Sequence, residues 1–346
     1  MTPSARLVPT DRGEIYTYES GPTEGTPVVL IHGNLSTGRY FEQVMAAAPS
    51  DYRMIAPDMR GFGRTPNRRV DATRGLRDWS DDAAALVHSL GTEQPVHLAG
   101  WSTGGAAVAT YAIDRPDEVA SLTFIDPVSP YGYGGVRADG TAAFADCAGS
   151  GGGTGNPDFA AAIAAGDRTT ASDLSPLNVL RSSYWAKDFT VDPEFEQVLL
   201  DEVLLSEIGD DGYPGDVSPS ENWPGIAPGT GGVLNALSPK YCNWTAIVEI
   251  EPKPRVLWTH GSDDIVVANG SPWEMGTLGS LGVVPDCPGP EVFPPQPMVD
   301  QIRAVLDEYA ARGGSVTSEI FEGSGHAPFI DARDRWQAVF FDFLAG

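Results

Sequence analysis

The sequence predicts an α/β protein whose mostly parallel sheet is flanked by helices and interrupted by an inserted cap. Three observations support this prediction. Short apolar runs bounded by turn residues recur along the chain, and helical patterns lie between them. This alternation of strand and helix is typical of a doubly wound sheet. The alternation stops between about residues 128 and 252, which indicates an insertion.

Seven apolar runs are predicted to be strands. The runs from residue 27 onward are mostly too continuous for half-exposed strands, so we expect them to be buried and parallel. The seven runs cover residues 14–20, 27–33, 52–58, 96–101, 121–126, 255–261 and 316–323.

Two stretches carry clear helical signals. Residues 76–91 begin with acidic side chains and end on glycine, as helices commonly do. Residues 297–312 place apolar side chains on one face, which predicts an amphipathic helix. Those side chains are Met298, Ile302, Val305, Leu306 and Tyr309.

The insertion is rich in Gly, Pro and Ser but also in aromatic residues, which pure linkers lack. We therefore expect a cap, or lid, of irregular loops and short helices over residues 128–252, with a core over 1–127 and 253–346. A further insertion covers about 268–295 at the same edge of the sheet. Trp185 and Trp223 are candidates for lining a pocket, and packing beneath the cap is the alternative. The aromatic residues of the cap are Tyr131, Tyr133, Tyr184, Trp185, Trp223, Tyr241 and Trp244.

The chain is strongly acidic. It has 346 residues, a formal net charge of −25 and only three lysines. Such a surface repels phosphate backbones and anionic lipid headgroups, so we expect neither nucleic acid nor a membrane as partner. A small-molecule substrate is the expected partner, and the sequence leaves the oligomeric state open.

The three cysteines, Cys147, Cys242 and Cys287, fit neither a zinc site nor a dense disulfide framework. Their spacing leaves open one disulfide, between Cys242 and Cys287. There is no apolar stretch of 18 residues and no leader-like segment in the first 30 residues. We therefore expect a soluble, cytoplasmic protein. The sequence leaves open whether a signal peptide has been removed.

Ser102 lies in a tight bend between a predicted strand and a small-residue helix, in the stretch VHLAGWSTGGAAVATY. A serine in a strained turn of this kind projects its hydroxyl above the sheet, and side chains two positions away would collide. Gly100 and Gly104 meet that requirement. The helix that follows favours developing negative charge. Ser102 is therefore a candidate nucleophile.

A serine hydroxyl needs a base to take its proton. His326 lies in a loop directly after the last predicted strand and before the last helix, and is the best-placed candidate. His88 and His97 lie within a helix and a strand, where packing or surface roles are expected. His32 and His260 each precede a glycine at a strand end, where we expect them to shape the turn.

The base in turn needs a carboxylate to fix its tautomer. Asp263 and Asp264 lie just beyond the carboxyl end of a predicted buried strand, the edge at which open α/β sheets keep their sites. Asp126 ends another strand and is a rival, its alternative role being a turn residue before Pro127. The residues alone leave all three carboxylates open.

Five motifs, in order along the chain, resemble those of the α/β-hydrolase superfamily. They are LIHGN, PDMRGFGRT, GWSTGG, HGSDDIVV and GSGHAPF. The resemblance covers residues about 14–127 and 253–346 and points to the capped serine hydrolase branch. It implies an eight-stranded, mostly parallel sheet with an inserted cap. An arginine at the position of Arg60 braces its loop, so we leave Arg60 out of the site.

The resemblance also implies roles for particular residues. Ser102 would be the nucleophile, His326 the base and Asp264 the acid, because the acid of the family usually follows the motif glycine by three residues. The backbone amides of Asn34 and Thr103 would form the oxyanion hole. Asp126 and Asp263 remain the alternative acids. The resemblance implies no metal and no cofactor.

The function implied by the resemblance is hydrolysis of a carboxylic ester or lactone, and the aromatic cap indicates a fairly hydrophobic substrate. The capped branch also contains C–C bond hydrolases that act on dienoic diketones, and cofactor-free haloperoxidases. The alternative that is not an enzyme is a binding protein that keeps the hydrolase fold and serves as a ligand receptor. Fold alone does not decide among these.

Overall fold

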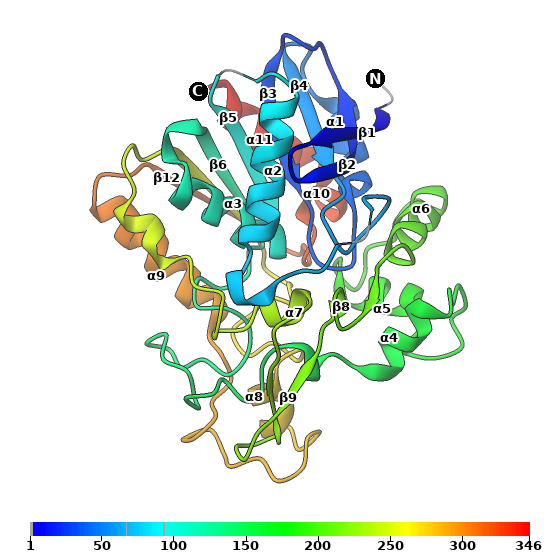
Figure 1. Ribbon diagram of the computed structural model, residues 1–346, viewed down its shortest axis with the longest axis vertical. Helices are drawn as coiled ribbons and strands as arrows, with labels where there is room; N and C mark the ends of the chain where they lie inside the picture. The colour runs from blue at the N-terminus through cyan, green and yellow to red at the C-terminus, as the bar shows by residue number, and fades with distance from the viewer. Residues whose placement is uncertain (1–2, 67, 93) are drawn as a thin grey trace.

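A computed structural model describes residues 3–66, 68–92 and 94–346. Its centre is an eight-stranded sheet with the strand order β1-β2-β4-β3-β5-β6-β11-β12 (Figure 1). The strands from β4 onward in that order run parallel, and β1 and β2 are antiparallel additions at one edge. The strands are β1 (Ser4–Thr10), β2 (Gly13–Ser20), β3 (Thr26–Ile31), β4 (Tyr52–Pro57), β5 (Val96–Trp101), β6 (Val119–Ile125), β11 (Arg255–Gly261) and β12 (Val316–Phe321).

The predicted fold class is confirmed, because helices flank this mostly parallel sheet. In the view of Figure 1, α2 and α3 lie in front of the strands and α11 lies behind them. The predicted helices over 76–91 and 297–312 correspond to α2 and α9. The helices of this part are α1 (Glu42–Ala47), α2 (Arg77–Ser89), α3 (Thr103–Asp114), α9 (Met298–Ala311), α10 (Pro328–Asp331) and α11 (Arg333–Ala345), with short 3₁₀ turns at η1 (Gly38–Phe41), η2 (Ala72–Arg74) and η3 (Pro116–Glu118).

The register of the central ladder aligns the carboxyl ends of four strands. Trp101 at the end of β5 pairs with Ile125 of β6, and Ile125 pairs with Thr259 of β11. Gly261 at the end of β11 pairs with Phe321 at the end of β12. The residues that follow these strands therefore meet at one edge of the sheet.

Two edge strands depart from the sequence predictions. The first strand, β1, is missing from the predicted set because only Val8 of its seven residues is buried, so it carries no apolar run. The last strand, β12, is mostly exposed or half-buried although buried strands were expected from residue 27 onward. It lies at the other edge of the sheet, where only β11 pairs with it.

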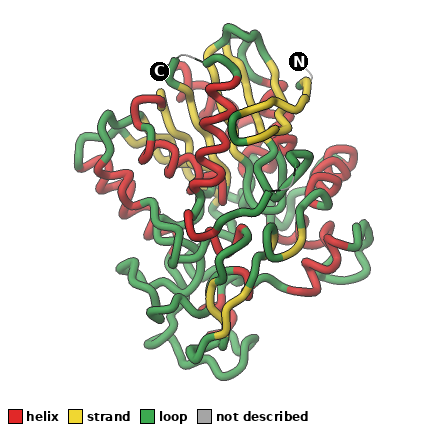
Figure 2. The backbone as a smooth tube through the Cα atoms, in the orientation of Figure 1, coloured by secondary structure: helices red, strands yellow, loops and turns green. Residues whose placement is uncertain are grey.

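The chain between β6 and β11 adds no strand to the main sheet in the described residues. It forms short helices, two small strand pairs and long loops, which appear mainly as green tube in the lower part of Figure 2. We call residues 128–252 the cap segment; its status as a separate domain stays a prediction. Its elements are η4 (Gly152–Thr154), α4 (Pro157–Ala164), α5 (Pro176–Ser183), α6 (Pro193–Val203), β7 (Ile208–Gly209), β8 (Tyr213–Pro214), β9 (Val217–Pro219), β10 (Ile226–Pro228), α7 (Val233–Ala236) and η5 (Thr245–Glu249).

The second insertion, residues 268–295, contains one short helix, α8 (Met275–Ser280). All three cysteines are free thiols, so the disulfide left open between Cys242 and Cys287 does not form. None of the helices in the described ranges is long and apolar enough to cross a lipid bilayer.

Candidate active site

Ser102 lies in a strained turn between β5 and α3. Its backbone has φ 54 and ψ −115, a conformation that L-residues rarely adopt. A Cβ on Gly100 would overlap the carbonyl oxygen of Gly104, and a Cβ on Gly104 would overlap that of Ile31. Glycine is therefore required at both positions, as the sequence predicts. The backbone N–H of Ser102 donates to the carbonyl of Ile125 at 2.9 Å, which ties the bend to β6.

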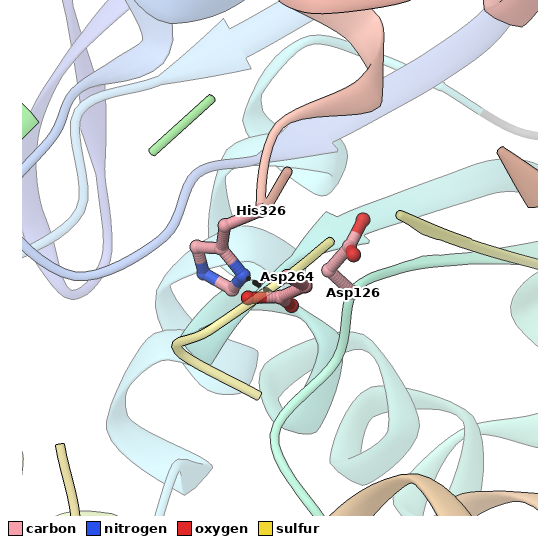
Figure 3. Close-up of side chains that lie close together, drawn as sticks. All are labelled: Asp126, Asp264 and His326. Atoms are coloured by element: carbon pink, nitrogen blue, oxygen red, sulfur yellow. Dashed lines mark hydrogen bonds and ion pairs between the residues drawn. The ribbon is translucent and has the colours of Figure 1, made fainter. Parts of the chain in front are cut away.

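His326 lies in the loop after β12, and its Nδ1 is 2.8 Å from Oδ2 of Asp264 (Figure 3). Oδ1 of Asp264 accepts from the backbone N–H groups of Val266 and Val267, at 2.7 and 3.1 Å. The carboxylate has no proton to give, so Nδ1 carries the hydrogen and Nε2 keeps its lone pair. His326 thus has the tautomer that a general base needs.

The pKa of Asp264 reflects opposing causes. Burial alone would raise this pKa, but the facing His326 ring and the amide of Val266 together hold it below its usual range. Both Asp264 and His326 are buried. An ionised Asp264 is therefore stable here, ready to stabilise a protonated His326.

The three candidate acids differ in position. Asp263 is exposed, and its carboxylate accepts from the hydroxyl of Ser262 at 2.9 Å. Asp126 is fully buried and lies on the side of Asp264 away from His326 (Figure 3). Among the described residues, only Asp264 hydrogen-bonds to a ring nitrogen of His326.

Ser102 and His326 line one cavity of about 570 Å³. Asn34 and Thr103, the two residues expected to supply the oxyanion hole, line the same cavity. Thr103 is the first residue of α3, so its N–H is one of the donors without a carbonyl partner inside the helix. The structure therefore gathers the predicted nucleophile, base and oxyanion residues around one space.

The rest of the cavity wall is largely apolar. No Asp, Glu, Lys or Arg occurs among its described lining residues. The walls come from the cap segment, from the 268–295 insertion and from loops at the sheet edge. The apolar lining includes Val128, Phe159, Leu174, Val179, Leu234, Leu237, Val266, Val267, Met275, Leu278, Val283 and Val284.

The cap aromatics line the cavity differently from the expectation. Trp185 and Trp223 do not line it: Trp185 is buried, and Nε1 of Trp223 donates to the carbonyl of Pro285 at 2.9 Å. Both tryptophans therefore pack against other parts of the protein, which is the alternative considered for them. The aromatic lining consists instead of Trp101, Tyr133, Phe159, Tyr184, Tyr213 and Trp273.

Three supporting residues escaped the sequence analysis. Nε1 of Trp101 donates to the carbonyl of His326 at 2.7 Å. The hydroxyl of Tyr184 donates to the carbonyl of Asn34 at 3.1 Å. Asp331 accepts from the N–H of Gly325 at 2.7 Å and from that of Ala186 at 2.8 Å. The available signal for Trp101 and Asp331 was their proximity in sequence to Ser102 and His326. For Tyr184 it was only its place among the aromatic residues of the cap.

The remaining histidines have structural positions. His88 is exposed on α2, and Nδ1 of His97 lies 2.7 Å from the hydroxyl of Ser121. Nε2 of His32 accepts from the N–H of Met59 at 2.9 Å, which fixes the turn after β3 as expected. His260 is buried within β11, close to both Asp126 and Asp264.

Arg60 braces its loop as predicted. Its guanidinium is buried and makes two hydrogen bonds to Asp82, at 2.6 and 2.7 Å. It also pairs with Asp78 at 3.1 Å. Arg60 does not line the cavity.

Known proteins resemble this chain mainly in its first half. A family model described as the alpha/beta hydrolase fold matches residues 26–146. The chain is 35% identical to the non-heme chloroperoxidase of Streptomyces lividans and 34% identical to the bifunctional esterase/perhydrolase DCH of Acinetobacter calcoaceticus, in each case over 122 residues. Each alignment covers 35% of this chain and 43% of the relative. The matched part thus spans under half the length of these relatives.

Solved structures resemble the whole chain at low sequence identity. An esterase from Exiguobacterium antarcticum aligns with a TM-score of 0.59 at 15% identity, covering 99% of this chain and 100% of the other. A mutant N-acyl homoserine lactonase AidH, complexed with N-hexanoyl homoserine, aligns with a TM-score of 0.55 at 19% identity, covering 99% and 96%. The strand order, the family model matched by residues 26–146 and these neighbours agree: the chain has the α/β-hydrolase fold.

Proposed function

We propose that this protein is a serine hydrolase that cleaves a carboxylic ester or lactone of an uncharged, fairly hydrophobic small molecule. The observation that carries the proposal is the hydrogen bond of 2.8 Å between His326 and Asp264. His326 and the strained Ser102 line the same cavity. That is the constellation of an activated serine nucleophile.

In the proposed reaction Ser102 attacks the substrate carbonyl carbon while Nε2 of His326 takes the hydroxyl proton. The negative charge that develops on the carbonyl oxygen is accepted by the backbone N–H groups of Asn34 and Thr103, each worth about 3 kcal/mol to the transition state. Asp264 stabilises the imidazolium. His326 then gives its proton to the leaving oxygen, and water, activated by the same ring, hydrolyses the acyl-enzyme.

The cavity supports an uncharged substrate. A carboxylate moved from water into this wall would lose its hydration without gaining a cationic partner, which is strongly unfavourable. The same argument disfavours a dienoic substrate that carries a carboxylate, and with it the C–C bond hydrolase alternative. Esters or lactones with aliphatic or aromatic acyl groups fit the lining.

A second candidate activity is perhydrolysis, in which hydrogen peroxide replaces water in the attack on the acyl-enzyme. The named activities of the two sequence relatives, non-heme chloroperoxidase and esterase/perhydrolase, favour this candidate. The ligand-receptor alternative would keep the cavity without turnover.

Hydrolysis of p-nitrophenyl esters of increasing acyl length and of aryl lactones, each with a carboxylate-bearing counterpart, tests the proposal. We expect turnover of the neutral substrates and little of the charged ones. A phosphonate should add to the wild type, with the adduct detected by intact mass, and Ser102→Ala should lose both adduct and turnover. Ser182→Ala, which removes an exposed hydroxyl from α5, is the matched control.

Full ester turnover by Ser102→Ala would refute the serine mechanism. An adduct without turnover of any panel member would favour the receptor alternative. Peracid formation on addition of hydrogen peroxide would support the second candidate.

A further inference from the structure

Asp126 is a buried carboxyl group that the proposed mechanism does not use. It follows β6 directly, is fully buried, and has a φ of 41, which few residues other than glycine adopt. Its backbone N–H donates to the carbonyl of Thr259 on β11 at 2.9 Å. The ladder thus fixes this side chain at the same sheet edge as Asp264 and His326, and one polar atom from each of the three lies within 4.8 Å of the other two.

The two oxygens of Asp126 have unequal surroundings. Oδ1 accepts from the backbone N–H of Gly261 at 2.8 Å. Oδ2 is buried and has no hydrogen-bond donor among the described residues. A buried anionic oxygen without a donor is costly. The neighbouring Asp264 offers only acceptors, so a hydrogen bond between the two carboxyl groups requires a proton on Asp126.

The charged and titratable groups around Asp126 do not favour a second negative charge. Asp264 and, from α10, Asp331 both raise the pKa of Asp126 after burial itself, the largest cause, so that this pKa lies well above its ordinary value. His326 is already hydrogen-bonded to Asp264. A further neighbour is His260 of β11, whose Nδ1 is 3.6 Å from Oδ1 of Asp126.

His260 is a poor source of compensating positive charge. Its Nε2 lies 3.0 Å from the carbonyl of Val267, an acceptor, so Nε2 carries the hydrogen. Its Nδ1 has no hydrogen-bond partner in the described part of the chain, which fits an unprotonated nitrogen. Burial is the main cause that lowers the pKa of His260, and His326 and Arg303 lower it further, against the opposing effects of Asp264 and the Val267 carbonyl. The ring is therefore neutral.

We propose that Asp126 is a positioning residue, held as a neutral carboxylic acid whose Oδ2–H donates a hydrogen bond to the Asp264 carboxylate. This inference rests on the proposed function. The donated bond fixes the Asp264 carboxylate from the side opposite His326. The two acidic groups then carry one negative charge between them, so one anion rather than two lies beside the His326 ring.

Two substitutions distinguish a neutral, hydrogen-bond-donating Asp126 from an ionised Asp126 and from an Asp126 without any positioning role. Asp126→Asn keeps the shape, tolerates the positive φ and supplies an N–H donor in place of the O–H. Asp126→Gly removes the donor without adding strain at that φ. Asp263→Asn removes a neighbouring but exposed carboxylate and is the matched control. Each variant is measured for kcat and for the pH profile of kcat/KM with p-nitrophenyl butyrate.

We expect Asp126→Asn and the control to keep kcat within about threefold and to leave the acidic limb of the pH profile in place, because neither changes the hydrogen bond or the charge beside His326. Asp126→Gly should lower kcat by about tenfold to a hundredfold, the usual cost of removing one partner of a buried hydrogen bond. The downfield proton resonance of His326 Nδ1–H should persist in Asp126→Asn and weaken in Asp126→Gly.

Other results would overturn the inference. A shift of the acidic limb by about one unit to lower pH in Asp126→Asn would mean that Asp126 is ionised in the native protein. A loss of about 10⁴-fold in kcat in Asp126→Asn would mean that Asp126, rather than Asp264, is the carboxylate that orients His326 and stabilises its protonated form. Wild-type kcat in Asp126→Gly would remove any positioning role. The proton resonance needs no turnover, so it tests the inference even if the proposed ester hydrolysis fails.

Discussion

The carboxyl edge of the sheet and the cap segment contribute to the same cavity in different ways. At the edge, Ser102, Asp126, Asp264 and His326 all follow strands whose ends are aligned by the backbone ladder. The cap segment supplies walls from loops and short helices that have no such ladder. The proposed reacting groups thus depend on regular backbone hydrogen bonds, and the proposed substrate fit depends on loop packing, a division common in α/β proteins.

The cap segment is nevertheless fixed to the core at identifiable points. Glu202 on α6 is fully buried, pairs with Arg64 at 2.8 Å and accepts from the hydroxyl of Thr37 at 2.8 Å. Tyr184 donates to the carbonyl of Asn34, and Ala186 donates to Asp331 of α10, which also accepts from Gly325 beside His326. The cap segment therefore also supports the loops on which the proposed chemistry depends.

The largest expected effect separates two adjacent carboxylates at the sheet edge. Asp264→Asn should lower kcat by about 10⁴-fold, because an amide facing Nδ1 favours the wrong tautomer of His326. Asp263→Asn should remain close to wild type, since that carboxylate is exposed and accepts its hydrogen bond from the hydroxyl of Ser262. Steady-state kinetics on one neutral ester measures both. Equal losses in the two variants would contradict the assignment.

Two glycine substitutions compare the edge with the cap segment directly. A Cβ on Gly104 would meet the backbone oxygens of Ile31 and His32, which the ladder holds in place, so Gly104→Ala should lower the free energy of unfolding by about 3 kcal/mol or more. A Cβ on Gly153 would meet the side-chain carbons of Ile226 and Val217, at 2.8 and 3.1 Å.

Because those side chains can move, Gly153→Ala should cost less than about 1 kcal/mol. Since Gly153 lines the cavity, its effect should appear in KM for long acyl esters. Urea unfolding of both variants checks the comparison. If Gly153→Ala lowered the free energy of unfolding as much as Gly104→Ala, the loops of the cap segment would be as rigid as the backbone of the sheet edge.

Sequence patterns predicted the edge well because its constraints are local. Gly100 and Gly104 flank Ser102 at fixed spacing, and His326 and Asp264 follow apolar runs that mark buried strands. The edge strand β1 was missed because one buried residue in seven gives no hydrophobic pattern. The position of Asp126 against Asp264 depends on strand order, which periodicity does not encode.

The cavity wall was the least predictable part. Tyr184 and Trp185 are neighbours of the same chemical class, yet Tyr184 lines the cavity and Trp185 packs away from it. In loops without periodicity, such a difference is decided by tertiary contacts, here the bond from Tyr184 to Asn34. The sequence predicts an aromatic cap without indicating which rings face the substrate.

The last expected effect concerns the histidine contribution to acid stability, which should originate in the core because all five histidines lie outside the cap segment. Burial, with Arg255 nearby, lowers the pKa of His97 to about 4 from the usual 6.5. Its neutral ring therefore stabilises the fold fully above pH 6.5, and this contribution is lost as the pH falls toward 4. The loss amounts to at most about 3 kcal/mol.

His97→Gln has no ring to protonate, so its free energy of unfolding should fall less than that of the wild type between pH 6.5 and 4. Urea unfolding at several pH values measures the difference, with His88→Gln, which removes an exposed imidazole from α2, as the control. Parallel pH dependence in wild type and His97→Gln would show that folding does not lower the pKa of His97. The hydrogen bond of Nδ1 with Ser121 at 2.7 Å and the burial of the ring argue for the neutral form, and so for diverging curves.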